Sequence, residues 1–87
     1  MEKNIYGLKP KYDSAKSFYR KAMVETDGNA KKLYSYDTLV ASVKNGVGEV
    51  YNLQSKTTTR HVREFLLQEG CDAGTQKQIY QDYFVNK

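Results

Sequence analysis

The fold is decided by the stretch Thr38–Tyr51, which reads TLVASVKNGVGEVY. Its first half is β-branched and apolar, and Asn45-Gly46 is the dipeptide that two-residue type I′ hairpin turns prefer. Pairing outward from this turn sets Lys44 opposite Val47. The register predicts one face toward the helices, made of Leu39, Ala41, Val43 and Val50. It predicts a wetter face made of Val40, Ser42, Glu49 and Tyr51.

Another hairpin is expected before this one. Residues 17–26 alternate with a period of two, and Leu33, Tyr34 and Tyr36 favour a second strand over residues 31–36. Asp27-Gly28-Asn29 between them tolerates positive φ and predicts the turn. The first 14 residues show no sustained period, so we expect a lead-in arm there.

After Asn52 the apolar residues recur at helical spacing. A helix is predicted from Thr58 to Glu69, with Gly70 at the left-handed C′ position and Ser55 or Thr57–Thr59 supplying a capping hydroxyl. A second helix is predicted to run to the C-terminus after a capping box of Thr75 and Gln78. Its apolar stripe consists of Ile79, Tyr80, Tyr83 and Phe84.

These elements predict one α+β domain over residues 1–87, since 87 residues leave no room for a second. The arm covers residues 1–14, the sheet residues 17–52 and the two helices residues 57–86. We expect an antiparallel sheet of about four strands, in two hairpins, with both C-terminal helices packed on one face.

Several function classes are disfavoured by the residue inventory. One Cys and one His make a zinc site improbable, and no Gly-rich phosphate loop or long apolar run is present, so no cofactor, metal or membrane association is expected. The absence of a signal peptide favours the cytoplasm. His61 is interpreted as a structural histidine at the rim of the helix stripe, and Cys71 as a small, partly buried apolar residue. We therefore predict no catalytic residues and no enzyme.

Features typical of binding proteins are better represented. The net charge is +4, which favours an anionic partner or serves solubility alone. The candidate anion-binding patch at the start of the first helix consists of Lys56, Arg60, His61 and Arg63. The alternative is that Arg60 pairs with Glu64 and Arg63 is merely solvated. A secondary basic and aromatic patch consists of Lys11, Tyr19, Arg20 and Lys21. Eight Tyr and three Phe suit either a protein interface or a single-stranded nucleic acid platform.

Several sequence boxes resemble a family of short proteins encoded by phages and mobile elements of Gram-positive bacteria. The boxes are Tyr12-Asp13-Ser14, Ser17-Phe18-Tyr19 with Lys21-Ala22, Leu33–Thr38 with Val40-Ala41, and Ser55–His61 followed by Glu64-Phe65-Leu66 and Gln68. Arg20 replaces the family's Gly, and Gln54 replaces the Tyr expected before Ser55. The resemblance implies a phage-type origin and a shared fold, and it brings no established activity that transfers to this chain.

The leading hypothesis is a non-catalytic binding protein that docks on a host nucleic-acid-handling complex, with an anti-CRISPR-like inhibitor as its most concrete form. The expected partner is a host protein or ribonucleoprotein complex in the cytoplasm of the bacterial cell. Two alternatives stay open: direct binding of nucleic acid, and a structural or accessory phage component. The oligomeric state is left open.

Overall fold

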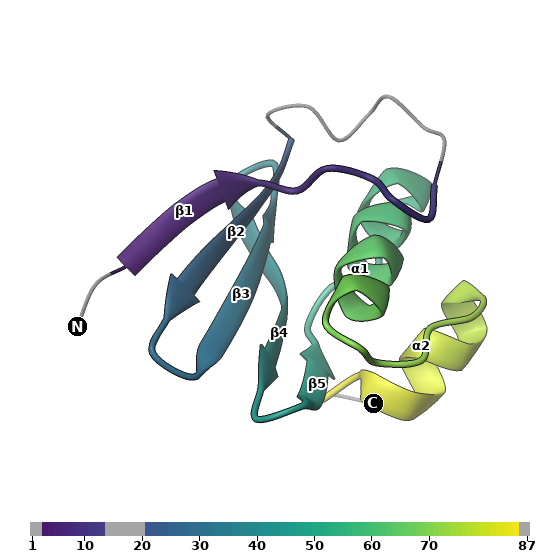
Figure 1. Cartoon of the computed structure of the whole chain (residues 1–87). Coiled ribbons are helices and arrows are strands. Elements are labelled where there is room, and N and C mark those ends of the chain that lie inside the picture. Colours follow the sequence, from purple (N-terminus) through teal and green to yellow (C-terminus); the bar gives the residue numbers. More distant parts are fainter. Residues whose placement is uncertain (1–2, 14–20, 86–87) are drawn as a thin grey trace.

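A computed structural model describes residues 3–13 and 21–85. The described residues form β1 (Lys3–Gly7), β2 (Ala22–Asp27), β3 (Ala30–Ser35), β4 (Thr38–Lys44), β5 (Val47–Val50), α1 (Lys56–Gln68) and α2 (Gln76–Tyr83). The strands pair antiparallel in chain order, and both helices lie on one face of the open sheet (Figure 1). The predicted α+β class is confirmed, with five strands in the described residues where about four were expected.

The predicted lead-in arm is wrong for residues 3–7, because they form the edge strand β1. β1 pairs antiparallel with β2 along its whole length. Its side chains do not alternate between core and solvent; Ile5, for example, is 64% exposed, so the sequence lacks the usual strand signal. Leu8 anchors the segment, since it is buried and its N–H donates to the carbonyl of Ala22 at 2.8 Å. The predicted first strand from residue 17 begins outside the described residues; within them β2 starts at Ala22.

The hairpin turn at Asn45-Gly46 is confirmed. Both residues have positive φ, 53° and 80°, and Lys44 pairs with Val47 as predicted. A type I′ turn needs these angles because its twist matches that of the two strands. The β3–β4 turn also has positive φ angles, 51° at Tyr36 and 66° at Asp37. The strand predicted over residues 31–36 is therefore wrong for Tyr36, because β3 ends at Ser35.

A β-bulge in β4 changes which side chains face the helices. Tyr34 pairs with Leu39, whereas the preceding residue, Leu33, pairs with Ala41. Val40 is therefore the extra residue of the bulge. Val40 is 1% exposed and Leu39 is 38% exposed, so the predicted sides of these two residues are wrong. The remaining apolar residues of the predicted inner face are buried as expected.

The core lies between the inner face of the sheet and the two helices. Val62, Phe65 and Leu66 from α1 and Ile79 from α2 are all 0% exposed. β5 comes close to the helices at Gly48, where a Cβ atom would lie only 3.0 Å from the Leu66 side chain and 3.1 Å from the Tyr83 ring. Glycine at this position therefore allows the helices to pack directly on β5.

The start and end of α1 follow the predicted capping residues. The N-cap Ser55 accepts a hydrogen bond from the Thr58 N–H at 3.0 Å, and the helix begins at Lys56, two residues earlier than predicted. At its end, Gly70 has φ 83°, and Cys71 N–H donates to the Leu66 carbonyl at 2.9 Å. This is the bond that closes a Schellman motif.

The second helix begins with the predicted capping box of Thr75 and Gln78 but ends at Tyr83, before the C-terminus. Phe84 forms a parallel bridge with Val50, and the Val85 N–H donates to the Val50 carbonyl at 3.1 Å. The chain after α2 thus covers the outer edge of β5 instead of continuing as a helix.

Candidate functional site

The solvent side of α1 carries a row of cations. Lys56, Arg60 and Arg63 are spaced i, i+4, i+7, so they lie on one face of the helix, which we call the basic face of α1. Lys56 and Arg60 are exposed and Arg63 is half-buried. Within residues 3–13 and 21–85, no carboxylate oxygen lies within 4.0 Å of their charged nitrogens. The basic face of α1 is therefore positive and has no ion-pair partner among the described residues.

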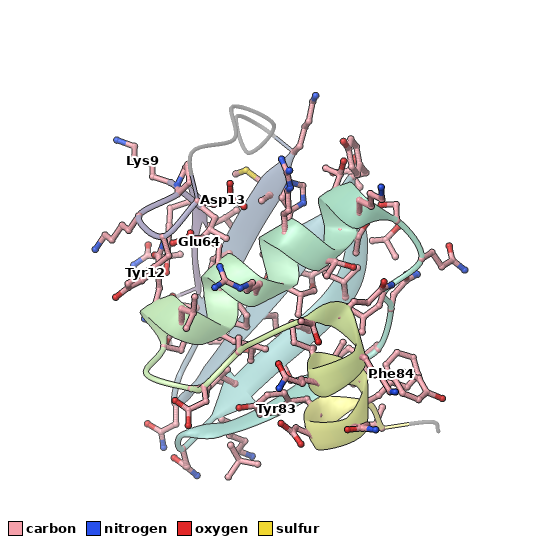
Figure 2. All side chains as sticks on the ribbon, turned by 90° about the vertical axis from the view of Figure 1, so that its right-hand side faces the viewer. Lys9, Tyr12, Asp13, Glu64, Tyr83 and Phe84 are labelled. Atoms are coloured by element: carbon pink, nitrogen blue, oxygen red, sulfur yellow. The ribbon has the colours of Figure 1, made fainter. Side chains whose placement is uncertain are left out.

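The alternative interpretation of the sequence required an ion pair between Arg60 and Glu64, and Glu64 does not form it. Its side chain is 1% exposed and accepts backbone N–H bonds from Lys11 at 2.8 Å and Tyr12 at 2.9 Å. The Gln68 amide donates to the same carboxylate. Figure 2 shows Glu64 and Tyr12 on the same side of α1. The carboxylate thus neutralises no cation of the basic face and instead holds residues 8–13 against the helix.

This contact brings part of the predicted secondary patch next to α1. The Lys11 side chain is exposed, while its backbone is bound by Glu64. Lys21 is also exposed, at the start of β2. Tyr19 and Arg20, the other members of that patch, lie outside the described residues. The Lys11 side chain lies with Lys9 and Lys31 beside the C-terminal end of α1, so the structure does not bring it to the basic face of α1.

His61 does not belong to the exposed patch in which the sequence placed it. It is 0% exposed, and its Nδ1 is 2.8 Å from the Ser35 hydroxyl oxygen. It lies one position after Arg60, and one step along a helix turns a side chain by about 100°. His61 therefore points into the junction of α1 and β3, where it contacts Ser35.

Cys71 is a half-buried thiol just after α1. Burial raises its pKa, and the nearby Glu69 and Asp72 carboxylates raise it further. A thiol with a raised pKa is less ionised at neutral pH, and the thiolate is the nucleophile. The surroundings of Cys71 thus work against a nucleophilic role.

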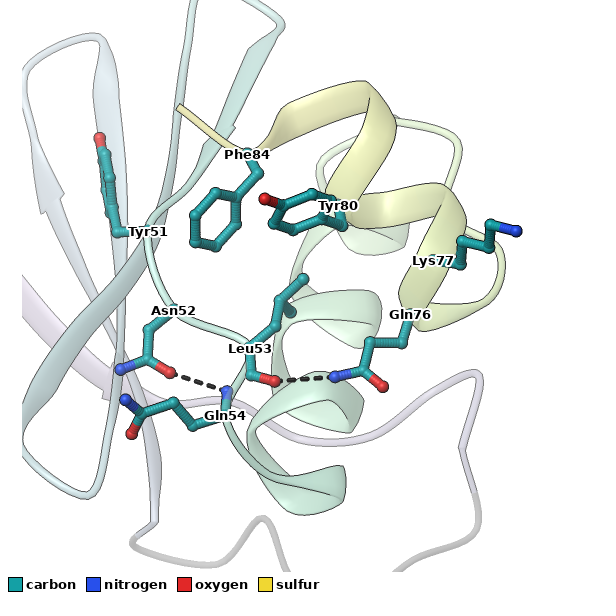
Figure 3. A pocket seen from close by; sticks show the side chains of 8 residues that line it. All are labelled: Tyr51, Asn52, Leu53, Gln54, Gln76, Lys77, Tyr80 and Phe84. Atoms are coloured by element: carbon teal, nitrogen blue, oxygen red, sulfur yellow. Dashed lines mark hydrogen bonds between the residues drawn. The ribbon is translucent and has the colours of Figure 1, made fainter. Parts of the chain in front are cut away.

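A hollow of about 470 Å³ lies between the end of β5, the β5–α1 connection and α2. It is lined by Tyr51, Asn52, Leu53, Gln54, Gln76, Lys77, Tyr80 and Phe84, and we call it the aromatic hollow (Figure 3). Tyr80 and Phe84 pack with ring centroids 4.7 Å apart and planes tilted by 32°.

The sequence placed Tyr80 on the apolar stripe of the second helix, but Tyr80 is 41% exposed and lines the hollow. Ile79 fills the core position instead and is 0% exposed. Periodicity alone cannot separate these neighbours, because both belong to the same stripe. The excess of tyrosines was the available sign that some rings lie outside the core.

Other kinds of site are not found in the described part of the chain. No three His, Cys, Asp or Glu residues there form a group that is able to hold a metal ion. No helix in that part is long and apolar enough to cross a bilayer.

Comparison with known proteins yields one match. No curated protein and no solved structure matches the chain. The model of a family of unknown function, DUF8033, matches residues 6–82. This range includes the whole basic face of α1 and every residue of the aromatic hollow except Phe84. The chain therefore belongs to the family DUF8033.

Proposed function

We propose that this protein is a non-catalytic binding protein that docks on a nucleic-acid-handling complex through the basic face of α1. The observation that carries the proposal is the inward position of Glu64, which is buried on the Lys11 and Tyr12 amides. Arg60 and Arg63 on the same helix therefore keep their full charge for a partner.

Glu69, the C-cap residue of α1, also has a partner within the protein. Glu69 accepts a hydrogen bond from the Lys31 ammonium at 3.1 Å, and this contact raises the pKa of Lys31. Glu64 and Glu69 thus have partners other than the cations of the basic face of α1. A surface of one charge sign speeds association with an oppositely charged partner and selects against partners of the same sign.

The positions of His61 and Cys71 support a binding role over a catalytic one. His61 is buried against Ser35, and the pKa of Cys71 is raised by burial. Neither group is both exposed and activated, which a nucleophile or its base requires.

The resemblance to phage and mobile-element proteins extends the proposal to a bacterial host. The complex would then be a host complex in the cytoplasm, and the docked protein would act as an inhibitor, with anti-CRISPR proteins as the most concrete type. The support for this extension is the resemblance of the sequence boxes.

The experiment captures partners from a bacterial lysate, with and without nuclease treatment, on immobilised wild-type, Arg60→Glu and Lys44→Glu proteins. Both substitutions change the net charge equally, and Lys44 is exposed at the β4–β5 turn, away from α1. We expect nuclease-resistant capture of a nucleic-acid-handling complex that falls about tenfold or more for Arg60→Glu and changes little for Lys44→Glu. Circular dichroism checks that each variant is folded.

Equal capture by both variants would contradict a role for the basic face of α1. Capture that disappears with nuclease, together with submicromolar and steeply salt-dependent binding to oligonucleotides, would replace the proposal with direct nucleic-acid binding.

A further inference from the structure

We propose that the aromatic hollow is a binding site for a nucleobase that carries a phosphate, because its described lining residues combine accessible aromatic rings, amide groups without partners among the described residues, and a lysine as the one charged side chain. This inference goes beyond the docking role of α1 and does not depend on it, since the hollow is formed by the β5–α1 connection, α2 and Phe84.

The aromatic rings supply the stacking surface. Figure 3 shows Phe84 between Tyr51 and Tyr80, with Leu53 below the rings. The Tyr51 hydroxyl is held by Ser42 at 2.8 Å and by Glu49 at 3.0 Å, which fixes the position of its ring. Tyr80 is 41% exposed even though it packs on Phe84. Held and accessible rings of this kind favour stacking with a flat ligand ring.

The amide side chains match the edge of a base. The Asn52 Oδ1 accepts from the Gln54 N–H at 2.9 Å, and the Gln76 Nε2 donates to the Leu53 carbonyl at 2.8 Å. These bonds orient both amides and leave the Asn52 NH₂ group as a donor and the Gln76 Oε1 as an acceptor, without partners among the described residues. The Gln54 side-chain amide has no hydrogen-bond partner among residues 3–13 and 21–85.

Nucleobases present donors and acceptors side by side on their edges, and an amide with both of its groups free pairs with them in a two-point contact. Gln54 keeps both groups without a partner among residues 3–13 and 21–85, while Asn52 and Gln76 each offer one group. The apolar side chain of a protein partner would stack equally well but would leave these amides unmatched. The amide groups therefore favour a nucleobase over an aromatic or aliphatic side chain.

Charge favours a phosphate at the rim of the hollow. Among the described residues that line the hollow, Lys77 is the one ionisable side chain besides the tyrosines and none is a carboxylate; the Glu49 carboxylate lies at the Tyr51 hydroxyl. Figure 3 shows the Lys77 amine pointing away from the rings, which places its charge outside the stacking surface. Lys56 follows the lining residue Gln54 by two positions and is exposed. A base in the hollow would thus have cations near its sugar–phosphate group.

Two kinds of ligand present both a base and a phosphate: a free nucleotide, and one nucleotide within a single strand. The test is a titration of the ¹⁵N-labelled protein, followed by NMR, with AMP, UMP, adenosine, inorganic phosphate and a single-stranded hexanucleotide. We expect shifts at the amides of Gln54, Gln76 and Tyr80, with nucleotides binding more tightly than adenosine. Equal affinity for AMP and the hexanucleotide assigns a free nucleotide, and about tenfold tighter binding of the hexanucleotide assigns a single strand.

Three variants make the test specific. Tyr80→Ala is expected to weaken nucleotide binding by about tenfold, within the range measured for the loss of one stacking ring, and Tyr80→Phe to retain it. Lys77→Glu should weaken AMP binding but not adenosine binding. Tyr12→Ala is the matched control, because Tyr12 is 58% exposed and does not line the hollow.

The inference is overturned if nucleotides at about 5 mM cause no shifts at the hollow, because a Kd above that concentration is too weak for a specific site. It is also overturned if Tyr80→Ala binds AMP as the wild type does, if phosphate alone causes the same shifts, or if shifts occur only on the basic face of α1. The last result would leave the proposed role of α1 intact, so the two failures are distinguishable.

Discussion

Glu64→Gln is expected to destabilise the protein strongly although it changes a single atom of the side chain. The Glu64 carboxylate is 1% exposed, and each of its oxygens accepts one backbone N–H bond, from Lys11 at 2.8 Å and from Tyr12 at 2.9 Å. An amide has only one acceptor oxygen. One of the two N–H groups must therefore face an NH₂ group in the variant.

The size of the effect follows from these two bonds. Losing one partly buried hydrogen bond costs about 1–3 kcal/mol, and changing the other from charged to neutral costs about 1 kcal/mol more. The expected loss is about 2–4 kcal/mol. Since 87 residues at typical values give a total stability of about 4–13 kcal/mol, this is a large fraction of the free energy of unfolding.

The assay is urea unfolding followed by circular dichroism, combined with hydrogen exchange of the Lys11 and Tyr12 amides. Glu69→Gln is the matched control, because Glu69 forms a more exposed ion pair with Lys31 that is worth less than about 1 kcal/mol. The reasoning is refuted if Glu64→Gln loses no more stability than Glu69→Gln and both amides keep their wild-type protection.

Three further outcomes are expected. Phe65→Ala should cost about 3–5 kcal/mol, because Phe65 is 0% exposed between α1 and the sheet, and a melting temperature within about two degrees of the wild type would contradict this packing. The Cys71 thiol should react with iodoacetamide at a higher pH in the folded protein than in urea, because burial raises its folded-state pKa. The stabilising effect of this proton is present below the unfolded-state pKa and is lost as the pH rises through the folded-state pKa. Identical pH profiles in the two states would contradict the raised pKa. Cys71→Ser should leave the affinity for the partner within about threefold, as for a residue without a chemical role.

The sequence was sufficient wherever a rule acts between residues that are close in the chain. Asn45-Gly46 adopts the positive φ angles of the predicted turn, and the strands pair outward from it in the predicted register. Ser55, Gly70 and the Thr75–Gln78 box act at the helix ends, where each serves backbone groups within four residues. These local bonds explain why the α+β layout was predictable.

The candidate site was only partly predictable. The i, i+4, i+7 spacing of Lys56, Arg60 and Arg63 is a local pattern, and it does form one exposed helix face. His61 was assigned to the same patch because its residue type suits an anion, but its helix position turns it into the core. The aromatic hollow was missed, because its residues come from two segments that meet only in the folded chain.

Sequence by itself thus determined the turns at residues 27–29 and 45–46, the helix caps, the register of the second hairpin and the positive row on α1, since each depends on contacts between near neighbours. Tertiary structure alone decided the edge strand β1, the bulge that buries Val40 and exposes Leu39, and the partners of Glu64. Glu64 is 53 residues from Lys11 in the chain. A helical pattern predicts the direction of a side chain, but it does not predict which distant group the side chain contacts. The same carboxylate would satisfy Arg60 on an isolated helix; in the folded protein it binds two backbone amides, because buried N–H groups need an acceptor.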